Sequence, residues 1–254
     1  MEKFTVDEWL RLHNLRVSQV TNIVESYTYS TLFDPCPEEF TVVESAEELW
    51  QAYGAAMLEA LPELREVIQK TVLETTRFFS VSGIENPETT YCPKTHSVIV
   101  KMDYGHDIWD ALHVAHEFGH ALQYHAMGQK FVPPIIREAA AFLCELIVID
   151  ALLDQDHGLA QAMDETRYDA GEFYSFDCGN ELITAISRMD APYRYSLNYP
   201  VARALADHVY SSERNISDVF YNRITVGAVI PTVNALLDVE ADLKSGIDRH
   251  TAVG

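Results

Sequence analysis

The stretch DIWDALHVAHEFGHALQYHAM, residues 107–127, decides both the fold and the chemistry expected of this chain. Residues 116–120 within it read HEFGH, an HExxH sequence. Residues four apart in an α-helix lie on the same face, so His116 and His120 can bind one ion together. Two imidazoles at this spacing suit Zn²⁺, one ion per chain, and Glu117 between them can act as general base toward a water molecule. We therefore expect a zinc-binding helix here.

A second apolar helix is expected after Pro133 and Pro134, in the stretch IIREAAAFLCELIVIDALL. It carries Glu138 and, two turns later on nearly the same face, Glu145. Catalytic zinc has three protein ligands and keeps its fourth position open. We predict that Glu138 is the third ligand. Glu145 either accepts a hydrogen bond from a ligating histidine ring or is a buried carboxylate without metal contact.

Composition limits the classes of protein to be considered. A chain of 254 residues can bury a sizeable core as one large domain or as two lobes around a cleft. No apolar run reaches the roughly 18 residues of a membrane span, and the acidic N-terminus is unlike a secretory signal, so a cytoplasmic location is the default. The formal charge of −21 repels phosphate backbones and argues against a nucleic-acid partner. Four cysteines without a CxxC pair are expected as buried thiols.

The remaining pattern predicts a mainly α-helical protein with one short β-sheet or edge strand near the zinc helix. Helical periodicity covers residues 6–30, and a further helix should begin at Ser45 and end at Pro62. Alternation of apolar and polar residues over 97–104 predicts a strand. Loops are expected at residues 34–37, 80–94 and 156–158, and helical patterns at 63–79, 159–169, 171–188, 198–212, 216–223 and 229–240.

Three stretches resemble the thimet oligopeptidase and oligoendopeptidase F family of zinc peptidases. HEFGHAL at residues 116–122 is similar to the family's HE(F/L)GHAL stretch. EAAAFLCE at residues 138–145 is similar to its second motif, a Glu followed by small residues and by another Glu seven positions on. PYRYSLNY at residues 192–199 resembles the family's tyrosine-rich stretch, whose phenols point into the active site. The resemblance covers residues 90–240.

This resemblance implies a zincin-like metallopeptidase core over residues 90–240, with N-terminal helices over residues 1–80, in a single compact catalytic domain 1–254. It also implies that Glu138 binds zinc and that strand 97–104 is an edge strand beside the bound peptide. The activity expected from it is zinc-dependent hydrolysis of peptide bonds in short or unstructured peptides.

Peptide hydrolysis also needs a hydrogen-bond donor for the developing oxyanion. Tyr193, Tyr195 and Tyr199 are the candidates, and we favour Tyr195 or Tyr199. Residues 193 and 195 share a face if the stretch is extended, whereas 195 and 199 share one if it is helical. His113, one turn before His116, either touches the cleft or simply packs in the core.

Two departures from the family leave a second function open. Little of the family's large N-terminal helical region fits in residues 1–80. The family also has a histidine shortly before the tyrosines that helps to stabilise the transition state, whereas no histidine lies between Leu159 and Asp207 here. The role of that histidine is vacant here, or it has passed to a tyrosine or to Arg194. The alternative function is therefore a zincin-fold metalloenzyme acting on a small non-peptide, biosynthetic substrate. A catalytically silent metalloprotein or interaction module is disfavoured, because structural zinc needs no general base such as Glu117.

The shortened N-terminal region also bears on assembly. Without the lobe that covers part of the catalytic core in the family, apolar surface would remain for a partner subunit to bury. We therefore expect the chain to self-associate as a homo-oligomer.

Overall fold

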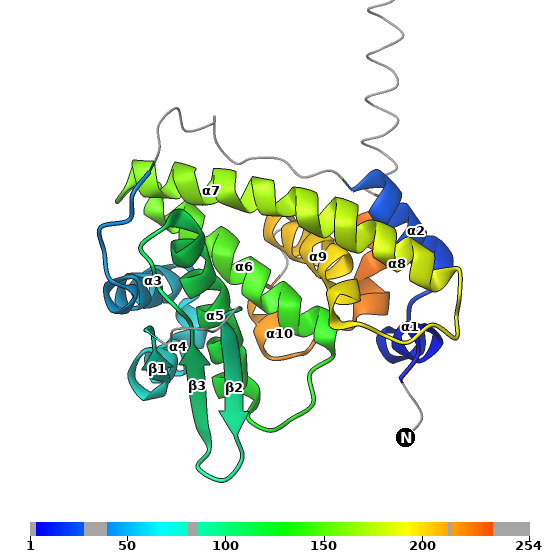
Figure 1. The fold of residues 1–254 in the computed structure, drawn as a ribbon. Coiled ribbons are helices and arrows are strands. Elements are labelled where there is room, and N and C mark those ends of the chain that lie inside the picture. Colours follow the sequence, from blue (N-terminus) through cyan, green and yellow to red (C-terminus); the bar gives the residue numbers. More distant parts are fainter. Residues whose placement is uncertain (1–3, 28–39, 81–85, 213–214, 236–254) are drawn as a thin grey trace, which may run out of the picture.

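The computed structural model describes residues 4–27, 40–80, 86–212 and 215–235. These residues form a mainly helical protein with one small three-stranded sheet. Helix α6 (Pro134–Leu152) packs against both α5 (Ile108–Met127) and α9 (Tyr199–Ser211), and α7 (His157–Glu172) lies across them (Figure 1). The loop expected at residues 34–37 lies outside the described residues.

Helix α6 lies at the centre of the core because most of its side chains are buried apolar groups. One contiguous hydrophobic cluster joins it to residues from Val6 to Val233. Both long helices predicted from the sequence are confirmed within one or two residues, and Asp107 caps the start of α5. None of the described helices is both long and apolar enough to cross a membrane.

The expected single helix over residues 6–30 is wrong. The chain forms α1 (Val6–His13) and α2 (Val17–Ser26), separated by a break at Asn14. Asn14 has a φ of 53°, and an asparagine in this left-handed conformation is a common end to a helix. Residues 28–30 of the expected helix lie outside the described residues.

The helix expected from Ser45 to Pro62 is confirmed, whereas the helix expected after it ends early. Helix α3 (Ala46–Ala60) begins at Ser45, whose side chain forms the expected capping box with Glu48. The 3₁₀ turn η1 (Pro62–Leu64) then interrupts the helix at the proline. Helix α4 (Arg65–Glu74) is shorter than the expected helix over 63–79, because the chain turns into strand β1 (Thr76–Phe78).

The sheet corrects two expectations. Its order is β1–β3–β2, with β3 (Ser97–Lys101) parallel to β1 and antiparallel to β2 (Glu88–Cys92). Residues 97–101 are therefore a strand, as expected, but the central one and not an edge strand. The edge strand beside α5 is β2, within residues that were expected to form a loop. Its Thr-Thr-Tyr sequence has high β-propensity, which the flanking prolines mask in the sequence.

In Figure 1, α7 runs across the top of the molecule, and α8 (Cys178–Ile186) and α9 lie on the side away from the sheet. Asp156 is the N-cap of α7 rather than part of a free turn. Helix α7 runs through a π-helical turn, η2 (Phe173–Asp177), into α8. The remaining elements are η3 (Tyr195–Asn198), α9, α10 (Ser217–Phe220) and a helical stretch over residues 226–235. Cys144 and Cys178 are buried thiols, as expected, Cys92 is half-buried, and Cys36 lies outside the described residues.

Candidate functional site

Two histidines and one glutamate converge between α5 and α6. His116 and His120 lie one turn apart on the face of α5 that packs on α6, with ring centroids 4.8 Å apart. Glu138 reaches them from the first turns of α6: its Oε2 is 3.5 Å from Nε2 of His116, and its Oε1 is 3.7 Å from Nε2 of His120. The structure therefore brings together the three residues predicted as metal ligands.

These separations fit a tetrahedral metal ion. Zinc ligands at 2.0–2.2 Å in tetrahedral geometry stand roughly 3.3–3.6 Å from one another. The two distances from Glu138 to the imidazole nitrogens are close to this range. The donor set of two imidazoles and one carboxylate is also one that catalytic zinc sites use.

A second carboxylate, that of Glu117, also lies near the histidines. Atoms of His116, Glu117 and His120 fall within 4.8 Å of one another, so Glu117 is an alternative third ligand. The electrostatics favour Glu138. Burial alone would raise its pKa, but the charges of the two histidines and the hydrogen bonds from His116 and Tyr195 lower the pKa of Glu138 to about 2, so it stays ionised. Burial raises the pKa of Glu117 to about 7, which suits a proton acceptor better than a ligand.

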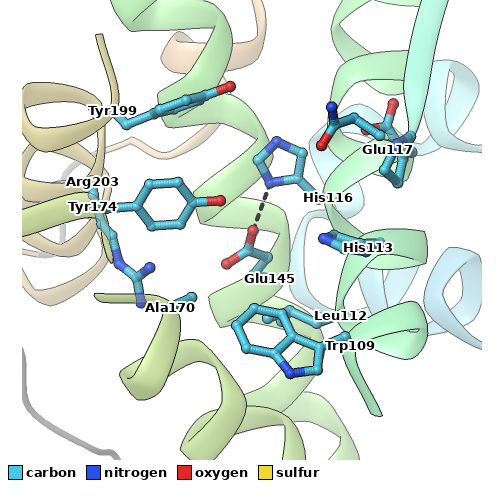
Figure 2. Close-up of a pocket in the computed structure, with 12 residues that line it drawn as sticks. Trp109, Leu112, His113, His116, Glu117, Glu145, Ala170, Tyr174, Tyr199 and Arg203 are labelled. Atoms are coloured by element: carbon cyan, nitrogen blue, oxygen red, sulfur yellow. Dashed lines mark hydrogen bonds and ion pairs between the residues drawn. The ribbon is translucent and has the colours of Figure 1, made fainter. Parts of the chain in front are cut away.

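Glu145 contacts His116 on the side of the ring opposite Nε2. Its Oε1 lies 2.6 Å from Nδ1 of His116, the hydrogen bond drawn as a dashed line in Figure 2. This is the hydrogen bond that the first of the two roles considered for Glu145 requires, and donation by Nδ1 would leave Nε2 to face an ion. Burial opposes a charge on His116, yet hydrogen bonds to Glu138 and Glu145 raise its pKa to about 10 in the metal-free site. Burial lowers the pKa of His120 to about 4.

Thr89 positions Glu117, and sequence reasoning missed it. The Thr89 hydroxyl donates to Oε2 of Glu117 at 2.5 Å. Thr89 belongs to strand β2, which packs along α5. The Glu117 side chain is 4% exposed, so this hydrogen bond restrains the carboxylate in a site that is largely closed to solvent.

The three predicted tyrosines have different positions. The Tyr195 hydroxyl donates to Oε1 of Glu138 at 2.6 Å, and Tyr199 lines the pocket in front of His116. The Tyr193 hydroxyl instead accepts a hydrogen bond from Asn198 at 2.6 Å. Arg194 forms an exposed ion pair with Glu181. Tyr195 and Tyr199 are therefore the tyrosines placed beside the predicted ligands.

A pocket of about 110 Å³ opens beside this cluster (Figure 2). His116, Glu117 and Glu145 line it on one side, and His113 is a lining residue as well, with a pKa lowered by burial. Three further side chains that the sequence did not single out also line it: Trp109, Tyr174 and Arg203. Figure 2 shows the Tyr174 hydroxyl pointing toward the His116–Glu145 pair. Tyr174 is placed there by the π-helical turn, which leaves no signal in the hydrophobic periodicity.

Gly119 explains how α5 and α6 approach closely enough to share the site. A Cβ at this position would lie 2.7 Å from Cα of Ala141 and 2.9 Å from the carbonyl oxygen of Ala140. The absence of a side chain therefore lets the two helix backbones come together.

Comparisons with protein families, with curated proteins and with solved structures gave no match for this chain.

Proposed function

We propose that this chain is a zinc-dependent peptidase that hydrolyses short or unstructured peptides and has a zincin-like core. His116, His120 and Glu138 would hold the ion. The observation that carries the proposal is the spacing of Glu138 from both imidazole nitrogens, 3.5 and 3.7 Å, with the Glu117 carboxylate held alongside. When bound, zinc would lower the pKa of a water molecule and polarise the carbonyl of the scissile bond.

Glu117 is the proposed general base. Its carboxylate would take a proton from the attacking water and then donate that proton to the amine that leaves when the C–N bond breaks. A pKa raised by burial to about 7 suits both steps at neutral pH. Thr89 would keep the carboxylate aimed at the pocket through the 2.5 Å hydrogen bond.

Tyr195 is the proposed oxyanion donor, with Tyr199 as the second candidate. Burial is the main cause that raises the pKa of the Tyr195 phenol well above its usual value, and the negative charge of Glu138 raises it further. The hydroxyl therefore keeps its proton and remains a donor. The side chain is 44% exposed and therefore has room to turn from Glu138 toward a substrate oxygen. The edge strand β2 would lie beside the peptide, in the position expected from the sequence for strand 97–104.

The size of the pocket supports a second candidate function, hydrolysis or another metal-assisted reaction of a small non-peptide substrate. The space of about 110 Å³ beside Glu117 is well below the roughly 300–1,000 Å³ of pockets that enclose whole drug-sized ligands. A peptide would place one side chain in this pocket and lie mostly outside it. A small substrate would be enclosed in full.

One experiment separates the two candidates. The purified full chain is incubated with a mixed peptide library, in parallel as the zinc-loaded form, the chelator-treated form and the chelator-treated form restored with zinc. We expect new peptide fragments with the first and third samples only, and none with zinc-loaded Glu117→Gln. Cleavage that persists after complete removal of metal would contradict the zinc mechanism. No cleavage by a fully zinc-loaded protein would favour the small-substrate candidate.

A further inference from the structure

A second hollow adjoins the pocket and has no role in the proposed chemistry. It is an open hollow of about 400 Å³, lined by Trp109, Asp169, Ala170, Phe173, Phe176 and Asp177. Trp109 and Ala170 also line the pocket beside His116. The two spaces therefore share a wall, and a molecule bound in one could extend into the other.

The aromatic part of this hollow comes from two separate elements. Trp109 stands in the first turn of α5, one turn before His113, and its ring centroid is 6.3 Å from that of His113. Phe173 and Phe176 belong to the π-helical turn that directs Tyr174 inward. The same turn leaves Phe173 52% exposed and Phe176 70% exposed, and Trp109 is 42% exposed. Exposed aromatic groups gathered beside a candidate active site are characteristic of a binding surface.

The negative charge of the hollow favours a cationic ligand. Asp169 and Asp177 are exposed carboxylates at its wall, and none of the six lining residues is basic. The formal charge of the chain, −21, adds to the attraction for cations. Aromatic faces attract cations, and carboxylates pair with them, while an apolar stem packs on the aromatic rings. A long basic side chain offers the cation and the stem together.

We propose that this hollow is a subsite for an arginine side chain of the substrate, held between the aromatic wall and the two aspartates. The planar guanidinium stacks on aromatic rings and pairs with carboxylates better than the compact ammonium of lysine. This assignment rests on the proposed peptidase function, because it identifies the substrates as peptides with a basic residue near the scissile bond. Because Trp109 and Ala170 line both spaces, an arginine held here would lie next to the pocket beside His116.

Binding is tested without catalysis. The probes are N-acetyl-arginine amide and N-acetyl-citrulline amide, which differ chiefly in the positive charge, and the protein is the full-length Glu117→Gln chain. The signal is tryptophan emission, because Trp9 and Trp50 are fully buried and Trp109 is the exposed tryptophan of the three in the chain. We expect the arginine probe to bind about 5- to 10-fold more tightly than the citrulline probe, the combined effect of an exposed cation–π contact and an exposed ion pair.

Matched variants test whether the preference for the arginine probe depends on the two aspartates of the hollow. In Asp169→Asn/Asp177→Asn the ratio of the two dissociation constants should fall close to one. In Asp154→Asn/Asp190→Asn, which removes the same charge from exposed positions elsewhere, it should stay unchanged. An arginine preference that survives Asp169→Asn/Asp177→Asn, or equal binding of both probes to the parent chain, would overturn the assignment.

A cleavage assay separates this inference from the proposed function. Two peptides that differ only by arginine or citrulline near the scissile bond are compared by kcat/KM with the zinc-loaded protein. Cleavage of both at equal rates would overturn the arginine subsite and leave the peptidase intact. No cleavage of either peptide, together with charge-dependent binding of the small probes at this hollow, would overturn the peptidase function and leave a basic-ligand site.

Discussion

The Tyr195 hydroxyl donates a hydrogen bond to Oε1 of Glu138 at 2.6 Å, and the same oxygen lies 3.7 Å from Nε2 of His120. A donor on the short turn η3 therefore touches the carboxylate that faces both histidines. An ion bound to this carboxylate would compete for the oxygen that Tyr195 now contacts. The phenol would then be available, without a large movement, to a substrate oxygen in front of the ion.

Removing this hydroxyl should slow turnover without removing the metal. We predict that Tyr195→Phe lowers kcat by about 10²–10³, the usual effect of losing one oxyanion donor, with unchanged zinc content. Tyr193→Phe is the matched control, because the Tyr193 hydroxyl contacts Asn198 instead. Steady-state kinetics with metal analysis measure both. A loss of kcat in Tyr199→Phe but not in Tyr195→Phe would transfer the role to Tyr199.

The two glutamates of α6 should differ in what their loss does to zinc affinity. Glu138 faces Nε2 of both histidines, whereas Glu145 contacts only Nδ1 of His116. Glu145→Gln should weaken zinc binding by about 10- to 100-fold, the range for partners that orient a ligand. Glu138→Gln should weaken it far more, because a ligand is lost. Competition with a chromogenic chelator measures both affinities, and the reverse order would make Glu145 the ligand.

Thr89 should matter to the rate through Glu117 alone. Thr89→Val keeps the shape of the side chain and removes the hydroxyl that holds Oε2 of Glu117. We predict that kcat falls about tenfold and that zinc affinity is unchanged. A loss of this size is within the range that misplacing a catalytic group causes. Thr89→Ser restores the hydroxyl and should recover most of the rate. Equal losses in Thr89→Val and Thr89→Ser would indicate a role in packing instead.

The grouping of His116, His120 and Glu138 could be predicted from the sequence because its signals are local. Residues four apart on one helix must share a face, and Glu138 follows within the next helix of the chain. The long-range partners left no such signal. Thr89 reaches Glu117 only through the pairing of β2 with β3, and pairing between strands is specified by distant residues. Tyr174 enters the pocket through a π-helical turn, which shifts the helical periodicity on which sequence reasoning depends.

The close contact at Gly119 predicts a large loss of stability on adding one methyl group. In Gly119→Ala the Cβ would meet backbone atoms of Ala140 and Ala141 at 2.9 and 2.7 Å, which neither helix can avoid without moving. We expect the free energy of unfolding to fall by about 1–3 kcal/mol or more, despite the better helix propensity of alanine. Gly105→Ala is the control, because its Cβ would meet only Asp110 at an ordinary 3.5 Å. Urea unfolding of both variants measures the difference.

The buried His13 side chain should make the stability of the protein depend on pH. Its ring is 3% exposed and packs edge-on against Trp9, and neither ring nitrogen has a hydrogen-bond partner among the described residues. Burial lowers the pKa of His13 to about 4, from 6.5 for an exposed histidine. The unfolded chain therefore takes up the proton first as the pH falls. The stability that the neutral ring provides is complete above pH 6.5 and is lost progressively as the pH falls to about 4.

The size and the test of this effect follow from the two pKa values. A difference of this size corresponds to a loss on the order of 3 kcal/mol between neutral pH and pH 4. His13→Leu has no proton to take up, so its unfolding free energy should fall less over the same range than that of the parent chain. Urea titrations of the metal-free protein at pH 7.5 and pH 4.5 measure this, since zinc release then adds nothing. His157→Gln, which removes an exposed histidine, should behave like the parent. An equal loss in His13→Leu and the parent would show that His13 does not carry this pH dependence.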